Sequence, residues 1–409
     1  MKKGGQRTTE NKKWIKFRHR IVRNIALCIL APYARLKYGV KVELFREQGN
    51  RPYLILMNHQ TPFDQFFVGM AFGGPVYYLA TEDIFSNGLV SALIKYLVAP
   101  IPIKKQTADV KAIMNCIRVA KDGGTIAIAP EGNRTYSGRT EYMSPAIAPL
   151  AKKLGMPIAL FRIEGGYGVH PRWSDVVRSG KMLGYVFRVI EPEEYSKLSN
   201  DELFAIIKDG LYVNEANGEE RYYHSKLAEY LERAIYVCPF CGLSEFESNR
   251  DRIKCKKCNR EILYLPSKEL VGIDFDFPFR FVAEWYDAQA DFINELNVLE
   301  YDSEPMYSES VELYEVIPCK KKILLCKETK LSLYGNRIEL VRTDEKAVCC
   351  FEETAAVTVL GRNKLNIYYG EKIYQIKGGK RFNALKYVHI FHRYKNVVRG
   401  DEDGKFLGL

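Results

Sequence analysis

Short apolar runs alternate with amphipathic segments between residues 50 and 190. Residues 53–57, 125–129 and 157–163 are continuous apolar runs that are too brief for a core helix, so they predict buried strands. Between them, apolar residues at helical spacing predict helices, one ending at Gly123-Gly124 and another around 146–154. Ser199 with Glu202 forms a capping-box pattern that opens a helix through about Ile207. This alternation predicts an α/β domain with helices flanking a sheet.

The second half of the chain has a different pattern. Residues 222–235 predict a helix, and the stripe from Val282 to Leu296 predicts another, with Gln289 as its polar interruption. A polar stretch at 302–309 indicates a linker. Short β-like segments then recur from 313 to 376, and residues 381–397 predict a closing helix. Several antiparallel strands with one C-terminal helix indicate a small β-rich domain of pleckstrin-homology type.

Basic residues are concentrated at the N-terminus. The net charge of the 409-residue chain is +11, which favours an anionic partner such as a membrane surface, a nucleic acid or a phosphorylated metabolite. Residues 1–23 carry nine Lys/Arg against one Glu, and the longest apolar run nearby, 25–34, is too short to span a bilayer. We therefore expect an interfacial anchor, with a basic tail leading into a core helix as the alternative. Its apolar residues are Trp14, Phe17, Ile21, Ile25, Leu27 and Leu30.

Four of the ten cysteines form two CxxC pairs separated by 13 residues. Such pairs typically converge on a tetrahedral zinc ion, and four thiolate ligands leave no open position for water. We therefore predict a zinc ribbon with one structural Zn²⁺. Its ligands are Cys238, Cys241, Cys255 and Cys258.

His59 follows the first predicted strand, and Asp64 follows five residues later. Thr61 is a suitable N-cap residue and Pro62 fits the first helical position, which places His59 in a loop and Asp64 in the first turn of a helix. From there the carboxylate can orient the imidazole as a general base. Alternatively, Asp64 is an acid favoured by the helix dipole and His59 an ordinary loop residue.

Two further loops follow strands and carry cations. Glu131, Gly132 and Arg134 lie after the strand at 125–129, and Lys104 and Lys105 end the apolar run that begins at Ile101. Gly132 permits a tight turn, and the planar fork of Arg134 suits a phosphate group. The carboxyl ends of the strands are where α/β sheets bind ligands, so we expect these loops to lie together.

The order of these blocks resembles the lysophospholipid acyltransferase family, most closely the 1-acyl-glycerol-3-phosphate acyltransferases of bacteria. "NHQTPFD" matches the first block of the family, "APEGNRT" the third and "MPIALFRIEG" the fourth. "IPIKK" falls where the family has an apolar run ending in Arg, so Lys105, with Lys104, replaces that Arg. The third block departs at Ala129 and Asn133, where the family has Phe and Thr. The resemblance covers residues 15–235, outside which lie the ribbon and the β-rich domain.

The resemblance implies a catalytic pair, His59 and Asp64, and a substrate site formed by Lys104, Lys105, Glu131, Gly132 and Arg134. It also implies an acyl thioester donor, either acyl-CoA or acyl-carrier protein, and a lysophospholipid acceptor. Together with the basic N-terminus, it suggests a cytoplasmic protein that is peripheral or monotopic on the inner face of the cell membrane. The predicted divisions are an anchoring segment (1–35), an acyltransferase domain (36–236), a zinc ribbon (237–265), a helix and linker (266–310), and the β-rich domain (311–409).

Two other classes of function stay open at this point. A basic chain with a zinc ribbon fits a nucleic-acid-binding protein, but the ribbon lacks the series of aromatic residues that stack on single strands, so no nucleic acid is expected. The other class is an inactive lipid-binding scaffold, against which the intact His59 and Asp64 argue.

Overall fold

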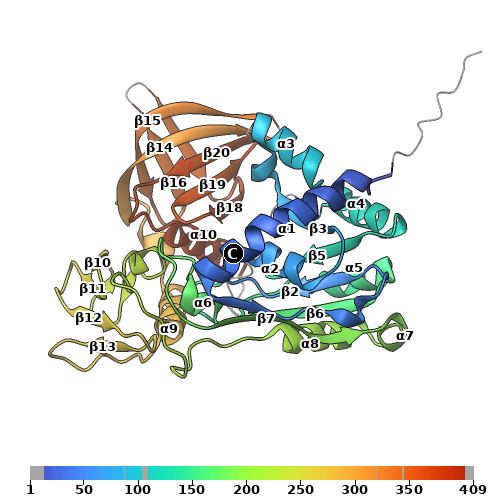
Figure 1. Cartoon of the computed structure of the whole chain (residues 1–409). Helices are drawn as coiled ribbons and strands as arrows, with labels where there is room; N and C mark the ends of the chain where they lie inside the picture. Colours follow the sequence, from blue (N-terminus) through green and yellow to red (C-terminus); the bar gives the residue numbers. More distant parts are fainter. Residues whose placement is uncertain (1–12, 87, 104–108, 319, 343–344, 401–409) are drawn as a thin grey trace, which may run out of the picture.

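A seven-stranded mixed sheet organises the first half of the chain (Figure 1). The computed structural model describes residues 13–86, 88–103, 109–318, 320–342 and 345–400. β2 lies near the centre, with β5 and β6 on either side, and both run parallel to it. β7 runs antiparallel to β6, which makes the sheet mixed. In spatial order, the strands are β1 (Val40–Val42), β7 (Met182–Ile190), β6 (Ile158–Glu164), β2 (Leu54–Met57), β5 (Thr125–Ile128), β3 (Val76–Thr81) and β4 (Ile101–Ile103).

Successive side chains of a strand point to opposite faces of a sheet. Because both sets of side chains are apolar here, helices cover both faces. Leu54 and Leu56 pack in a core with α4, α5 and α8, whereas Ile55 and Met57 pack with α1 and α2. The predicted strands and the capping box at Ser199 are confirmed. The helices of this half are α1 (Phe17–Tyr38), α2 (Asp64–Ala71), α3 (Leu89–Leu97), α4 (Val110–Lys121), α5 (Ile147–Leu154), α6 (Gly166–Val169), α7 (Pro192–Tyr195) and α8 (Asn200–Leu211), with 3-10 turns at η1 (Arg46–Gln48) and η2 (Glu82–Ser86).

The helix predicted over residues 222–235 is wrong. The Tyr222 amide donates to the carbonyl of Pro266 at 2.8 Å, and Tyr223 forms a β-bridge with Ser179. The backbone groups of this segment are therefore used by distant segments, and only the 3-10 turn η3 (Leu231–Arg233) is helical. Tertiary hydrogen bonds override the apolar periodicity here.

A small antiparallel sheet carries the cysteine pairs. Its four strands lie in the order β10, β11, β12 and β13, and a two-stranded ladder, β8 with β9, holds the first CxxC pair. Helix α9 (Val282–Glu295) packs behind it, and the buried Gln289 of this helix accepts hydrogen bonds from the amides of Tyr236 and Val237. The polar interruption in the α9 stripe thus anchors the ribbon. The strands are β8 (Val237–Cys238), β9 (Gly242–Leu243), β10 (Phe246–Asn249), β11 (Arg252–Cys255), β12 (Glu261–Tyr264) and β13 (Leu270–Gly272).

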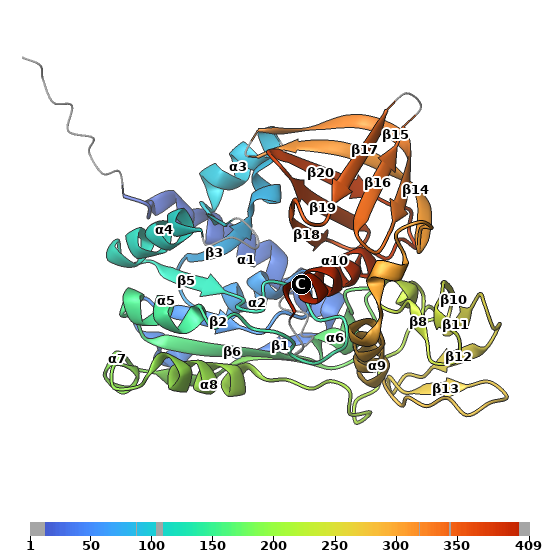
Figure 2. The ribbon, with the colours of Figure 1, turned by 180° about the vertical axis from the view of Figure 1, so that it is seen from behind.

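The C-terminal module, residues 307–399, is a seven-stranded antiparallel sheet that curls and is closed by one helix, as predicted (Figure 2). The linker predicted at 302–309 ends earlier than expected, because β14 begins at Tyr307, whose buried hydroxyl donates to the Tyr236 and Ser244 carbonyls. Its elements are the 3-10 turn η4 (Val298–Glu300) just before it, β14 (Tyr307–Ile317), β15 (Lys321–Leu333), β16 (Arg337–Val341), β17 (Lys346–Cys350), β18 (Thr354–Leu360), β19 (Lys364–Tyr369), β20 (Lys372–Lys377) and α10 (Leu385–Arg399).

One hydrophobic core joins the ribbon, α9 and the C-terminal module, and it includes Tyr136, Tyr167 and Trp173 from the first half of the chain. Both views place α10 between the C-terminal sheet and the mixed sheet (Figures 1 and 2). The C-terminal module is thus built onto the carboxyl-end side of the parallel strands, where the predicted site lies.

Candidate active site

His59 and Asp64 form a hydrogen bond at the carboxyl end of β2. The imidazole Nδ1 lies 2.7 Å from Asp64 Oδ2, with the carboxylate fully buried and the histidine side chain 24% exposed. Because a carboxylate only accepts hydrogen bonds, Nδ1 carries the proton, which leaves Nε2 as the basic atom. The pair therefore has the arrangement of a general base with its orienting acid.

Asp64 also organises the turn before its helix. Its carboxylate accepts from the amides of Gln60 and Thr61 and from the Thr61 hydroxyl at 2.6 Å. The predicted N-cap is wrong, because α2 begins at Asp64 with Phe63 at the N-cap, so Thr61 and Pro62 precede the helix. These hydrogen bonds to Asp64 hold residues 60–61 in a compact turn, and the helix begins after that turn.

The loop that holds His59 is fixed from three sides. The His59 amide donates to Glu131 Oε1 at 2.8 Å, and its carbonyl accepts from the Thr135 amide at 3.1 Å. Asn58 exchanges two hydrogen bonds with the backbone of Ile163 on β6, and Gln60 accepts from the Tyr167 amide. Sequence reasoning missed Asn58 and Gln60 because their partners lie about 105 residues away.

The loop after β5 brings Glu131, Gly132 and Arg134 to the same edge, as expected. Burial, the largest influence, raises the pKa of Glu131 to about 8, against a smaller lowering by its bond from the His59 amide. Its Oε2 is buried and has no hydrogen-bond partner. Gly132 has φ +70°, a left-handed conformation that disfavours other residues.

Arg134 has a guanidinium nitrogen that makes no hydrogen bond. Burial first, and then the charge of Arg172, lowers its pKa to about 10, and its buried Nη1 has no partner. Lys104 and Lys105, the other predicted cations, lie outside the described residues.

A cavity of about 1580 Å³ opens at His59. Most of its wall is apolar. Elements from both faces of the mixed sheet contribute to this wall, including Leu27 of α1, Leu79 of β3 and Ile113 of α4. Phe391 and His392 of α10 also line it, so the C-terminal module forms part of the wall. Glu131, Gly132 and Asn133 line the same cavity next to His59. The arrangement can hold an apolar chain with its reactive end at the imidazole.

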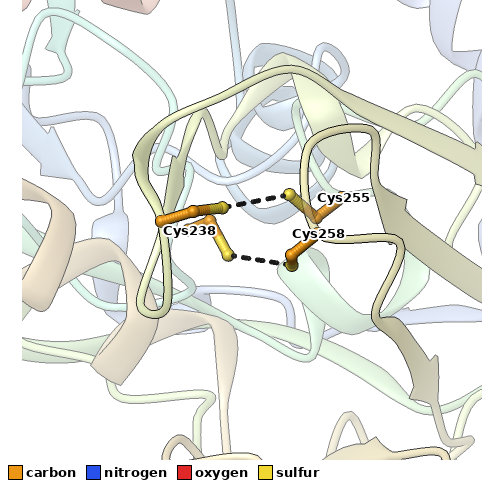
Figure 3. Close-up of side chains that lie close together, drawn as sticks. Cys238, Cys255 and Cys258 are labelled. Atoms are coloured by element: carbon orange, nitrogen blue, oxygen red, sulfur yellow. Dashed lines mark hydrogen bonds between the residues drawn. The ribbon is translucent and has the colours of Figure 1, made fainter.

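The four cysteines of the ribbon converge, and Figure 3 shows Cys238, Cys255 and Cys258 close together. All four sulfur atoms lie within 4.8 Å of one another, with Cys238 and Cys258 at 3.8 Å and Cys241 and Cys255 at 3.6 Å. In a tetrahedral site with Zn–S bonds of about 2.3 Å, neighbouring sulfurs lie roughly 3.8 Å apart. The cluster can therefore hold a metal ion, and its donor set fits zinc.

The predicted anchor residues divide into two groups. Phe17, Ile21 and Ile25 are exposed on α1, continued by Ile29. Trp14 instead packs on the core and donates to the Ala99 carbonyl at 3.1 Å, and Leu27 and Leu30 line the cavity.

Helix α3 lies beside α1 and adds exposed Leu89, Leu93 and Tyr96. In both views α1, α3 and α4 occupy the same side of the molecule (Figures 1 and 2). Within the described part of the chain, no helix has the length and apolar character needed to cross a membrane.

Part of this chain is similar to known acyltransferases. The model of the family named Acyltransferase matches residues 39–163, which contain β2, β5, His59 and the Glu131–Arg134 loop. This segment is therefore similar to the acyltransferase family. The acyltransferase domain of this chain is also similar to 1-acyl-sn-glycerol-3-phosphate acyltransferase LPAT1, chloroplastic, from Arabidopsis thaliana, at 20% identity over 191 residues.

That alignment covers 46% of this chain and 52% of the relative, so the chain spans about half the length of the curated relative it matches. The crystal structure of the 1-acyl-sn-glycerophosphate (LPA) acyltransferase PlsC from Thermotoga maritima matches with a TM-score of 0.39 and 20% identity, covering 47% of this chain and 76% of that one.

Proposed function

We propose that this protein transfers a fatty acyl group from an acyl thioester to the free hydroxyl of a lysophospholipid, 1-acyl-glycerol-3-phosphate, and thereby forms phosphatidate. The observation that carries the proposal is the 2.7 Å hydrogen bond between His59 and Asp64 at a large, mostly apolar cavity. The match of residues 39–163 to the acyltransferase family supports the same chemistry.

In the proposed reaction His59 Nε2 removes the proton of the acceptor hydroxyl as its oxygen attacks the thioester carbonyl. Asp64 stabilises the imidazolium that forms. The tetrahedral intermediate collapses with cleavage of the C–S bond, and the leaving thiolate takes the proton back from the imidazolium. Because the acceptor attacks directly, no covalent acyl-enzyme is needed.

The remaining site residues are assigned to substrate binding. Arg134 binds the phosphate of the acceptor, with Lys104 and Lys105 as further cations. Glu131, protonated at neutral pH because burial raises its pKa to about 8, and the Gly132 turn shape the wall beside the base. The donor is acyl-CoA or acyl-carrier protein, and its acyl chain occupies the apolar part of the cavity.

The ribbon and α1 have supporting roles in this proposal. Cys238, Cys241, Cys255 and Cys258 hold one structural Zn²⁺, which stabilises the fold and takes no part in the reaction. The exposed apolar residues of α1 and α3 and the basic N-terminus attach the protein to a phospholipid surface, the inner face of the cell membrane.

A product assay tests the proposal. Purified protein is incubated with 1-acyl-glycerol-3-phosphate and labelled acyl-CoA or acyl-carrier protein, and labelled phosphatidate is measured. A parallel reaction with monoacylglycerol tests the need for the phosphate. We expect phosphatidate from lysophosphatidate and little product from monoacylglycerol. If neither donor gives labelled product with either acceptor, the proposal is wrong.

A further inference from the structure

Two guanidinium groups beside the active site, buried Arg172 and half-buried Arg134, have no carboxylate partner among the described residues. Arg172, 3% exposed, follows α6 and donates to the Arg134 carbonyl at 2.9 Å and to Asn133 Oδ1 at 3.3 Å. Its guanidinium carbon lies 4.3 Å from the centre of the Tyr136 ring. Arg172 Nε and Arg134 Nη1 are buried without a hydrogen-bond partner. A buried charge without a counter-ion is costly, so this pair of arginines is arranged for an anion.

The nearby carboxyl groups are committed elsewhere. Asp64 accepts from His59, Gln60 and Thr61. Asp175 is shared by two other arginines, Arg233 at 2.6 Å and Arg362 at 3.0 Å. Glu131 is largely protonated at neutral pH, since burial raises its pKa to about 8. The positive charge of Arg134 and Arg172 is therefore left for a ligand.

Arg362 of the C-terminal module is a third cation near these two arginines. Arg362, on the turn between β18 and β19, donates to His170 Nε2 at 2.7 Å as well as to Asp175. His170 accepts because it is neutral: burial, and then the charges of Arg362 and Arg134, lower its pKa to about 3. Its Nδ1–H is left to donate to the Tyr38 hydroxyl, 3.1 Å away. The charge of Arg362 also acts on Arg134 and lowers its pKa, after burial and Arg172.

We propose that Arg172, and Arg362 of the C-terminal module, join Arg134 in binding the phosphomonoester of the proposed function. A phosphomonoester carries nearly two negative charges at neutral pH and offers three oxygens to such a cluster. The inference deepens the proposed function, on which the identity of the ligand rests. It also explains why a module outside the acyltransferase domain is docked at this edge of the sheet.

Two substrates of the proposed reaction could supply a phosphomonoester, namely the headgroup of the acceptor and the 3′-phosphate of CoA. The position favours the acceptor. Thr135, next to Arg134 in the chain, is hydrogen-bonded to His59, and in lysophosphatidate only two carbon atoms separate the reacting hydroxyl oxygen from the phosphate ester oxygen. In acyl-CoA the whole pantetheine arm separates the thioester from the nucleotide.

Binding and kinetics of single variants test this site. Arg172→Met and Arg362→Met are compared with Arg51→Met, which removes an exposed ion pair with Glu191 near the amino end of β2. Calorimetry measures binding of sn-glycerol 3-phosphate to each full-length protein. Steady-state assays give KM for lysophosphatidate, for acyl-CoA and for acyl-dephospho-CoA.

Loss of a charged hydrogen bond predicts a roughly 10- to 100-fold weaker affinity for glycerol 3-phosphate, and a similar rise in the KM of lysophosphatidate, in Arg172→Met. We expect a smaller rise in Arg362→Met, whose side chain is 30% exposed, and none in Arg51→Met. If the KM of acyl-CoA rises while the KM values of acyl-dephospho-CoA and lysophosphatidate do not, the phosphomonoester belongs to the donor.

Two outcomes separate this inference from the proposed function. Arg172-dependent binding of glycerol 3-phosphate without any acyl transfer leaves the anion site standing and removes the function. Acyl transfer with unchanged affinity and KM in both folded variants overturns the anion site alone. Because Arg172 also holds the Asn133–Arg134 loop, Arg362→Met keeps the test valid if Arg172→Met fails to fold.

Discussion

Replacing Asp64 with Asn removes one charge from the active site while preserving its shape. The amide oxygen can take the place of Oδ2, where it accepts from His59 Nδ1 and the Gln60 amide. The amide nitrogen then faces the Thr61 hydroxyl, which turns from donor to acceptor, and the Thr61 amide keeps only its bond to the oxygen in the place of Oδ2. We therefore expect the free energy of unfolding to fall by only about 1 kcal/mol.

The effect on the rate follows from the charge. An imidazolium and a carboxylate whose charge centres lie about 4 Å apart attract by roughly 4 kcal/mol at an effective dielectric constant of about 20. The 24% exposure of His59 weakens this attraction, so we expect kcat to fall roughly 10²- to 10³-fold.

The assay measures initial rates of acyl transfer to lysophosphatidate between pH 5 and 9. Asp201→Asn, an exposed acid in the first turn of α8, is the matched control. Urea unfolding of each protein shows that the fold is retained. A folded Asp64→Asn variant with kcat within threefold of the wild-type value would refute the role given to this carboxylate.

Four further predictions follow from the structure. Because burial raises the pKa of Glu131, this group binds more protons in the folded than in the unfolded state between about pH 4.5 and 8, so it should lower stability in urea by up to about 1.4 kcal/mol per unit rise in pH there, and Glu131→Gln should change the slope of stability against pH by that amount; equal slopes in the two proteins would count against it. Metal analysis should find one zinc per chain. Cys258→Ser should lose this zinc and have a lower free energy of unfolding, while catalysis has no step that depends on the metal. A folded protein that contains no zinc would contradict this. Arg134→Ala should raise the KM of lysophosphatidate and leave that of acyl-CoA nearly unchanged, whereas equal changes for both would argue against a phosphate contact. Exchanging exposed Phe17 and Ile21 for Ser should reduce sedimentation with anionic vesicles at high salt; undiminished binding would show that these side chains do not insert.

The elements closest to His59 and Asp64 could be predicted from sequence because local pattern determines them. A short apolar run gives β2, and the resemblance of the loop that follows it singles out His59 and Asp64. The convergence of the four cysteines was predicted because spacing alone constrains a tetrahedral site.

Features that depend on distant partners could not be predicted in this way. His170 and Arg362 are 192 residues apart in the chain, and their hydrogen bond exists only because the C-terminal module docks on the first half of the fold. The helix predicted over 222–235 failed for the same reason, since the Tyr222 amide bonds to Pro266 rather than within a helix. The amphipathic pattern predicts Trp14 as a lipid anchor, but its indole donates a hydrogen bond to the Ala99 carbonyl.

The most direct test of the central claim compares His59→Ala with His224→Ala. His224 does not line the cavity, and its imidazole accepts from the backbone of Lys226 at 3.0 Å. Mass spectrometry measures phosphatidate formed from lysophosphatidate and acyl thioester by each folded variant. We predict product from His224→Ala at the wild-type rate and a loss of at least roughly 10²-fold in His59→Ala, with glycerol 3-phosphate still bound. Phosphatidate formed by His59→Ala at the wild-type rate would contradict base catalysis by this histidine.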